Sequence, residues 1–517
     1  MEQRSKWSSQ TGFLFAAMGS AIGLGNIWRF PYLAYEKGGG AFLVAYVVAL
    51  LTAGIPLMML EFGLGHSMVG SSVVSFWRVN RRLEWFGWWM PLLVMYGIML
   101  YYMVVLGWCL NYVWFSLDLA WGKDTQSFFL NSFLKVSNNA WDLQDIVGPI
   151  FVSTALVWFI IWFICYKEVN KGIERACKVF MPALFALTLI LVFWGCSLEG
   201  AGRGLTYYLK PDWSKLKDVT LWTSAYGQIF FSLSIGFGIM ITYASYLPRK
   251  SNLVQNAIIT SIADSAYAFT AGLAVFSVLG YLAHTQNLPA TNEAFRQVVK
   301  DGPILAFVTY PQAISELPAF NRLFGVFFFI CLALAGITSA ISIVEALTCA
   351  IRDKFSLARG KVVSILCATG FLGSLVFVCR SGLTWLDIAD HFINHYGLVL
   401  AGFLECVFIG WILKARTIRK HVNAVSAWRL PEMWDYLVKF VSPAVLGVIY
   451  VMDVVNIIRN GYPSGPGKEP YASSWLILIG VNALILSFIL ATVFTIYPWR
   501  RKPELIIHRP EEDKLLT

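Results

Sequence analysis

Long runs of apolar residues recur along almost the whole chain. A transmembrane helix needs about 20 mostly apolar residues, and polar or Gly- and Pro-containing segments separate such runs here. The pattern predicts twelve membrane-spanning helices, at residues 12–36, 41–66, 88–117, 147–166, 176–198, 222–247, 254–282, 323–351, 362–379, 383–413, 437–457 and 473–498. We therefore expect an all-α polytopic membrane protein. A transmembrane β-barrel would instead show alternating strands of about ten residues.

Composition narrows the function classes. Only 14% of the 517 residues are charged, whereas 57% are hydrophobic. Soluble domains carry roughly 25% charged residues, so this chain has too few charges to cover several soluble domains. A soluble enzyme, a disordered protein and a coiled coil all fit this composition poorly.

The positions of Lys and Arg predict how the chain crosses the membrane. Basic residues favour cytoplasmic loops, and most of the 40 basic residues lie on the side of the N-terminus if the spans alternate. We expect a multi-pass protein of the cell membrane with both termini in the cytoplasm. The net charge of +10 follows from this bias, so no nucleic-acid partner is expected. The nine cysteines form no CxxC pair and are interpreted as small buried residues.

Two spans carry clusters of Gly and Ser at their centres. The first contains GSAIGLGN at 19–26, and the sixth contains SLSIGFG at 232–238. Gly costs a helix about 1 kcal/mol relative to Ala, and an unsatisfied backbone group in lipid costs several kcal/mol. We predict that both helices break there, with other groups satisfying the freed backbone. The alternative is close helix packing through small residues.

The breaks lie five spans apart, as expected for two related halves. We predict one membrane unit over residues 1–517, with inverted repeats at 12–198 and 222–413, two additional spans within 437–498, and a cytoplasmic tail at 499–517. Gly-interrupted segments in matching positions point to the binding site of an inverted-repeat transporter. The segment GPILAFVTYPQAISELP at 302–318 is interpreted as a loop that folds back against the protein.

Ionisable residues within spans are costly and usually functional. This set contains one base and otherwise acids: Arg29, Glu61, Asp264, Glu345, Asp390, Glu405 and Asp453. No His completes a hydrolytic or zinc site with them, so we expect cation handling rather than an enzyme. Glu61 and Glu345 are expected to accept hydrogen bonds from amides freed at the helix breaks.

Oxygen-bearing groups gather beside the two breaks. They include the side chains of Asn26, Ser232, Ser234, Thr338 and Ser339. Such hard oxygen donors suit Na⁺, and the N-termini of half-helices can hold a carboxylate. The sequence thus predicts a site for a small anionic or zwitterionic ligand beside oxygen-bound cations. A single Ser or Thr in a span more often bonds to its own helix than to a ligand, and it is the clustering of these groups that favours a site.

Several strings together resemble the neurotransmitter:sodium symporter family, whose fold is known as the LeuT type. They are GSAIGLGNIWRFPYLAYEKGGGAF (19–42), IPLMMLEFGLG (55–65), GQIFFSLSIGFGIMITYASY (227–246), the run at 302–318 and AGITSAISIVEAL (335–347). The resemblance covers most of spans 1–10 in the family's order. It implies a 5+5 inverted repeat with broken first and sixth helices.

The resemblance also implies two sodium sites. The first would use Ala21, Asn26, Ser232 and Asp264, and the second would use Gly19, Ile22, Ala335, Thr338 and Ser339. Two Na⁺ ions are therefore expected as co-substrates.

A substrate site and two gates follow from the same motifs. The resemblance places the substrate against Ala21, Leu24, Gly25, Ile98, Tyr102, Phe231, Ser232, Ser234, Phe237, Ser339 and Ile343. Arg29 and Asp390 would form the outer gate. Arg4 with Asp353, and Trp7 with Tyr246, would form the inner gate.

Two departures from the family pattern bear on function. Gly23 stands where monoamine members have Asp, and it leaves room for a substrate carboxylate. Asp264 stands where animal members usually have Asn, and Ala268 lies at the position often occupied by Ser at their chloride site. We hypothesise that Asp264 supplies the charge that chloride provides elsewhere.

These observations predict a chloride-independent sodium symporter that imports a neutral, aliphatic amino acid by alternating access. The alternatives are larger aromatic amino acids or a monoamine, proton coupling in place of sodium, and a channel or sensor that uses the same fold without coupled transport. Its expected partners are the amino-acid substrate and the lipid bilayer, and the sequence leaves open whether it forms a homodimer.

Overall fold

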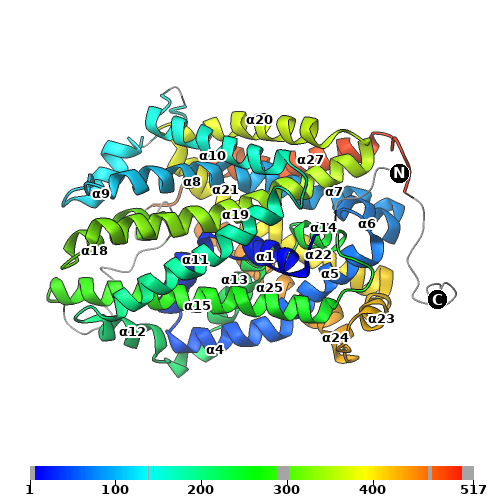
Figure 1. Ribbon diagram of the computed structural model, residues 1–517, viewed down its shortest axis with the longest axis horizontal. Helices are drawn as coiled ribbons and strands as arrows, with labels where there is room; N and C mark the ends of the chain where they lie inside the picture. The colour runs from blue at the N-terminus through cyan, green and yellow to red at the C-terminus, as the bar shows by residue number, and fades with distance from the viewer. Residues whose placement is uncertain (1–5, 138, 144, 289–301, 464–468, 504–517) are drawn as a thin grey trace.

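Figure 1 shows the computed structural model of the chain, which describes residues 6–137, 139–143, 145–288, 302–463 and 469–503. Ordered secondary structure in these ranges is helical, and β-structure is limited to isolated bridges such as Gly39 with Pro211. The long helices run roughly side by side along the long axis of the molecule (Figure 1). This arrangement confirms the predicted all-α fold.

Within the described ranges, ten helices are long and apolar enough to cross a membrane, and the bent first pair would make an eleventh span. They are Gly40–Met68, Arg81–Phe115, Gly148–Tyr166, Ile173–Cys196, Leu253–Thr285, Asn321–Phe355, Arg359–Val378, Gly382–Val425, Met433–Asn460 and Ser473–Ile496. Within them the labelled helices are α4 (Gly40–Ala49), α5 (Ile55–Met68), α7 (Glu84–Leu93), α8 (Met99–Phe115), α10 (Gly148–Tyr166), α11 (Ile173–Cys196), α15 (Leu253–Thr285), α19 (Asn321–Phe355), α20 (Arg359–Val378), α21 (Gly382–Phe392), α22 (Val399–Val407), α23 (Ala415–Val425), α24 (Met433–Tyr436), α25 (Ser442–Asn460), α26 (Ser473–Trp475) and α27 (Asn482–Ile496). Each of the ten overlaps one of the predicted spans, whereas α23 and α24 lie outside the predicted bounds.

Shorter helices connect these spans. They are α6 (Ser72–Val79), α9 (Thr125–Ser127), α12 (Ala201–Leu209), α17 (Gly302–Ile304) and α18 (Tyr310–Glu316). Helices α9, α12 and α18 lie at one end of the molecule, which we name the α18 end, and α6, α23 and α24 lie at the opposite end, the α23 end (Figure 1). The segment at 302–318 packs back onto the protein, since Phe307 and Tyr310 are buried there. The expected fold-back is confirmed.

The first span is broken as predicted. Helix α1 (Gln10–Ala21) ends at the Gly-rich motif, and α2 (Leu24–Ile27) and α3 (Arg29–Glu36) continue at an angle of 65°. Ile22 and Gly23 between them have extended backbone conformations. The carbonyls near the end of α1 therefore lose their helical partners.

The sixth span is broken beside the first break, where Ser234 Oγ donates to the Ser20 carbonyl. Helix α13 (Val219–Ser232) stops six residues before α14 (Ile239–Ala244). Gly236 and Gly238 have φ values of 81° and 74°, a left-handed conformation that glycine adopts without a steric penalty. Glu61 Oε1 accepts the Gly236 N–H at 2.7 Å, which confirms the expected role of Glu61.

Apolar side chains cover the outer surface of the bundle. Examples are Phe193, Ile458, Val152 and Ile496, which are 73%, 77%, 65% and 77% exposed. A surface of this kind is stable in lipid rather than in water. The fold therefore matches a membrane protein, while the division into two inverted repeats stays a prediction.

Candidate functional site

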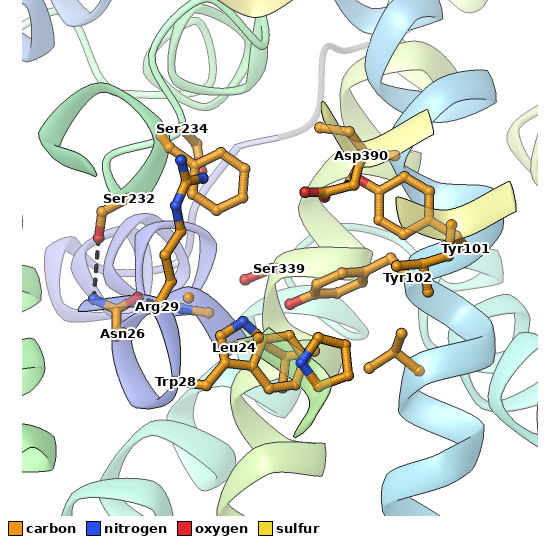
Figure 2. Close-up of a pocket in the computed structure, with 18 of the residues that line it drawn as sticks. Leu24, Asn26, Trp28, Arg29, Tyr101, Tyr102, Ser232, Ser234, Ser339 and Asp390 are labelled. Atoms are coloured by element: carbon orange, nitrogen blue, oxygen red, sulfur yellow. Dashed lines mark hydrogen bonds between the residues drawn. The ribbon is translucent and has the colours of Figure 1, made fainter. Parts of the chain in front are cut away.

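A cavity of about 350 Å³ lies where the two broken spans meet α8, α19 and α21 (Figure 2). Its wall includes residues on both sides of the first break and of the sixth. All eleven substrate residues predicted from the sequence line it: Ala21, Leu24, Gly25, Ile98, Tyr102, Phe231, Ser232, Ser234, Phe237, Ser339 and Ile343. The tertiary structure thus brings together residues that are more than 300 positions apart.

Four backbone carbonyl oxygens surround the hydroxyl of Ser339. Its Oγ is 3.3 Å from the carbonyl oxygens of Gly19, Ser20, Ile22 and Ala335. A hydroxyl carries one proton, so it cannot saturate four acceptors. Three of these carbonyls belong to the predicted second sodium set, and the local excess of acceptors over donors suits a cation.

Thr338 lies beside these carbonyl oxygens, but its hydroxyl is hydrogen-bonded within its own helix. Its Oγ1 donates to the carbonyl of Ala335 at 2.9 Å and lies 3.2 Å from that of Leu334. The same oxygen retains lone pairs that can face a cation. The structure thus shows the local bonding that the sequence analysis gave as the alternative for a single Thr.

The predicted first sodium set also comes together. Asn26 Nδ2 donates to Asp264 Oδ1 at 2.8 Å and to Ser232 Oγ at 3.0 Å. Ser232 Oγ in turn lies 2.9 and 2.8 Å from the two Asp264 carboxylate oxygens. All three side chains are buried. The Asp264 carboxyl group is therefore hydrogen-bonded to both Asn26 and Ser232.

The cavity wall around Gly23 is tight. A Cβ at this position would lie 3.2 Å from Ser339 Oγ and 3.4 Å from Tyr102 Oη. Both hydroxyls point into the cavity, as Figure 2 shows. The absence of a side chain at Gly23 thus keeps two hydroxyls accessible to a ligand.

Two predicted ligand groups have partners within the chain. Ser234 Oγ donates to the Ser20 carbonyl at 3.0 Å, and the carbonyl of Phe231 accepts the Ser234 N–H at 3.1 Å. A ligand ammonium would compete with these bonds.

Sequence reasoning missed part of the apolar wall. Val105 and Ile239 also line the cavity. Val105 lies two helical turns after Ile98, so helical periodicity could have placed both on one face. Ile239 is the first residue of α14, and no local signal marks it.

The predicted outer-gate residues face one another across the cavity (Figure 2). Arg29 and Asp390 are both described, yet no ion pair joins them. The Arg29 guanidinium lies 5.3 Å from the centre of the Phe231 ring. Asp390 Oδ1 accepts the Tyr101 hydroxyl at 2.7 Å and Asn394 Nδ2 at 2.8 Å. The α18 side of the cavity is therefore not sealed by this pair.

The α23 side is closed by aromatic contacts. Trp7 Nε1 donates to the Tyr243 carbonyl at 3.0 Å, and the rings of Trp7 and Tyr246 lie 6.2 Å apart, edge to face. Asp353 Oδ2 accepts the Ser71 N–H at 2.9 Å. Arg4, the expected partner of Asp353, lies outside the described residues. Together, these contacts close the α23 side of the cavity, whereas no Arg29–Asp390 ion pair closes the opposite side.

The expectation for Glu345 is wrong. Its carboxylate accepts two bonds from Arg359, at 3.1 and 2.6 Å, and one from the Tyr246 hydroxyl at 2.7 Å. These partners are charged and hydroxyl groups rather than amides freed at a helix break. The reason is tertiary, because α20 begins beside α19 and projects Arg359 toward it.

A membrane bundle in which two broken helices border one oxygen-rich cavity is the architecture expected of a membrane transporter. The sequence profile of the sodium:neurotransmitter symporter family matches residues 4–128 and 122–502. The chain belongs to this family, and it is a sodium-dependent symporter rather than an enzyme.

Individual relatives agree with this family over nearly the full chain. An uncharacterised sodium-dependent transporter of Methanocaldococcus jannaschii is 42% identical over 497 residues, covering 96% of this chain and 99% of that protein. The human sodium- and chloride-dependent neutral and basic amino acid transporter B(0+) is 30% identical, covering 96% and 86%. The sodium-dependent serotonin transporter of Drosophila melanogaster is also 30% identical, covering 96% and 82%.

Proposed function

We propose that the protein imports a neutral amino acid with an aliphatic side chain, coupled to two Na⁺ ions and independent of chloride. The observation that carries this proposal is the geometry around Gly23. Gly23 leaves the hydroxyls of Tyr102 and Ser339 open toward the cavity, where they can donate to a substrate carboxylate, whereas an Asp side chain at this position would crowd both hydroxyls and add a second negative charge. The human relative named for neutral and basic amino acids supports this substrate class.

The apolar wall favours aliphatic side chains. Ile98, Phe237 and Ile343 line the cavity with Val105 and Ile239. Branched side chains on several walls restrict the width available to a bulky ring. An apolar pocket of this kind discriminates by size, at roughly 1–3 kcal/mol for one methylene.

The second sodium ion is assigned to the group of carbonyl oxygens around Ser339. Gly19, Ile22 and Ala335 would contribute carbonyl oxygens, and Thr338 and Ser339 would contribute hydroxyl oxygens. The four carbonyls at 3.3 Å from one hydroxyl support this assignment, because a cation would relieve their mutual repulsion.

The first sodium ion is assigned to Asn26, Ser232, Asp264 and the carbonyl of Ala21. Asp264 brings a negative charge directly to this site, so no chloride is needed to balance the ion. Nearby, Gln228 is fully buried and neither of its side-chain polar atoms has a partner among the described residues. Ala268 is also fully buried and contributes no polar group.

The transport cycle is alternating access. Na⁺ binding stabilises the arrangement open toward the α18 end, which we assign to the outside, and completes the substrate site. Substrate then draws Tyr102 and Phe231 over itself, Arg29 approaches Asp390, and the contacts of Trp7 with Tyr243 and Tyr246 open on the cytoplasmic side. Both termini are assigned to that side.

The sodium gradient supplies the energy. One charge crossing 100 mV releases about 2.3 kcal/mol, and a tenfold concentration gradient adds about 1.4 kcal/mol. Two ions thus provide roughly 7 kcal/mol, enough for an accumulation of about 10⁵-fold of a net-neutral substrate.

The proposal is tested by measuring binding and uptake of the twenty amino acids in proteoliposomes, with Na⁺ or choline outside. We expect sodium-dependent, uphill accumulation of aliphatic amino acids that collapses when the sodium gradient is dissipated. Accumulation that persists in choline would contradict sodium coupling, and downhill flux alone would indicate a channel.

A further inference from the structure

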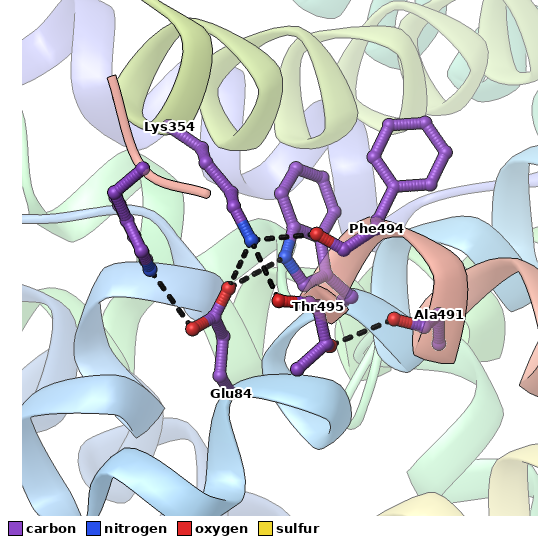
Figure 3. Close-up of polar contacts among 7 residues, drawn as sticks. Glu84, Lys354, Ala491, Phe494 and Thr495 are labelled. Atoms are coloured by element: carbon purple, nitrogen blue, oxygen red, sulfur yellow. Dashed lines mark hydrogen bonds and ion pairs between the residues drawn. The ribbon is translucent and has the colours of Figure 1, made fainter. Parts of the chain in front are cut away.

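A lysine that does not line the cavity is buried among α7, α19 and α27 (Figure 3). Lys354 is 0% exposed, and its Nζ lies 2.5 Å from Glu84 Oε1. The same Nζ donates to the carbonyls of Phe494 and Thr495 at 2.6 and 3.1 Å. Its three N–H donors therefore meet three acceptors.

The acceptors come from different parts of the chain. Glu84 begins α7, and Phe494 and Thr495 lie in the last turn of α27, whose carbonyls lack partners within the helix. A cation at a helix C-terminus also meets the negative end of the helix dipole. Lys354 thus joins the ends of α7, α19 and α27 at one atom.

The segment that follows α27 packs over the same point. Trp499 Nε1 donates to Glu84 Oε2 at 2.9 Å, and its ring lies 5.9 Å from the ring of Trp77 in α6. The Arg500 N–H donates to the Lys354 carbonyl at 3.1 Å. The chain after the last span is therefore fixed to the end of α19.

The end of α19 also carries the predicted inner gate. Asp353 directly precedes Lys354 and accepts the N–H of Ser71. Glu345, Cys349 and Asp353 are spaced by four residues, so they share one face of α19. Tyr246 bonds to Glu345 on this face, and Cys349 Sγ lies 3.8 Å from Asp353 Oδ2.

We propose that Lys354 is a positioning residue for the inner gate. Together with Glu84 and Trp499, it fixes the last turn of α19, and it thereby holds Asp353 and Cys349 in the closed arrangement of the α23 end. The segment 497–500 acts as a strap that favours the outward-open state. This inference rests on the proposed assignment of Asp353 to the inner gate.

The test uses the native Cys349 as a reporter, because it is buried on the gate face. Full-length protein is treated with a small maleimide in NaCl or choline chloride, and modification of the Cys349 peptide is followed by mass spectrometry. The variants are Trp499→Ala and the double variant Glu84→Gln with Lys354→Met, which removes both buried charges together. Arg501→Gln is the matched control, since it removes a neighbouring exposed charge that makes no bond to the cluster.

We expect both variants to raise the rate of Cys349 modification in NaCl by roughly threefold or more, as a shift of population toward the open gate requires. The exposed Cys196 and the Arg501→Gln protein should react as in the wild type. A lower melting temperature with an unchanged Cys349 rate would overturn the inference, because the cluster would then be structural only.

If the proposed sodium coupling is wrong, the experiment gives a result that differs from failure of the Lys354 role. A wild-type Cys349 rate that is the same in NaCl and choline contradicts sodium-driven gating. The positioning role of Lys354 is judged separately, by the ratio of variant to wild-type rates in one salt.

Discussion

Two buried polar clusters in this protein differ in how their acceptor oxygens find positively charged partners. Around Ser339, four carbonyl oxygens lie 3.3 Å from a single hydroxyl. Around Lys354, a carboxylate and two carbonyls meet an ammonium group that carries three protons. Acceptors outnumber donors in the first cluster, whereas the two are matched in the second.

This difference indicates which of the two clusters can bind and release a cation. The cation of the Lys354 cluster is covalently part of the chain, so that cluster holds helix ends together permanently. The Ser339 cluster concentrates negative potential between two helices without a resident positive side chain. Under the proposed sodium assignment, a mobile cation enters and leaves this site, and its binding links α1 to α19 reversibly.

The largest expected effect follows from altering the exchangeable cluster. Thr338→Val removes a hydroxyl oxygen at nearly constant volume and should abolish sodium-dependent uptake. Sodium at about 100 times its Kd stabilises a protein by roughly 2.7 kcal/mol, and the variant should lose most of this stabilisation. Unfolding curves recorded with and without Na⁺ measure the loss.

Thr270→Val is the matched control, because Thr270 likewise donates within its own helix, at 2.7 Å, but lies on an exposed face. It should retain the sodium response. A near-normal sodium affinity in Thr338→Val would contradict the second sodium assignment.

The permanent cluster should respond in stability instead. Lys354→Met leaves Glu84 buried without its cation, and breaking a buried pair in this way costs about 3–5 kcal/mol. Adding Glu84→Gln should recover much of that loss. Denaturant midpoints in detergent, compared between the single and double variants, check this expectation; equal midpoints would show that Glu84 does not depend on Lys354.

A smaller effect is expected from the wall of the cavity. Ile343→Gly should shift the preference toward larger side chains, with a change in relative affinity of about tenfold to a hundredfold. Competition between leucine and phenylalanine for uptake measures it. Ile341→Gly, a buried position on the same helix outside the cavity wall, should lower stability without changing the preference.

The smallest expected effect is that of chloride. Replacing chloride by gluconate should leave uptake kinetics unchanged, because the Asp264 carboxylate already stands among Asn26 and Ser232. Uptake assays in matched sodium salts test this. A large loss in gluconate would refute the role of Asp264, and Asp264→Asn should lower uptake in either salt.

Much of the fold could be predicted from the sequence, because lipid imposes strong local rules. Every predicted span contains a helix, and both breaks lie in the predicted motifs. The role of Glu61 was also predictable, since a broken helix must find acceptors for its freed amides.

Other outcomes had no local signal. Lys354 and Arg359 lie between the predicted spans 323–351 and 362–379, where an exposed loop is expected, yet both are buried in ion pairs. The partner of Glu345 depends on where α20 begins relative to α19. Arg29 and Asp390 lie apart because the arrangement of the helices around the cavity, rather than the residues themselves, sets their distance.

The sequence by itself determined the membrane class, the order of the apolar helices and the positions of the two breaks, since these follow from apolar run length and from the backbone preferences of Gly. Only the tertiary structure decided which carbonyls surround Ser339, which buried acids form ion pairs with Lys or Arg side chains, and which side of the cavity is closed. These features depend on contacts between distant segments, and the free energy of such contacts is set by packing and local dielectric rather than by neighbouring residues in the chain.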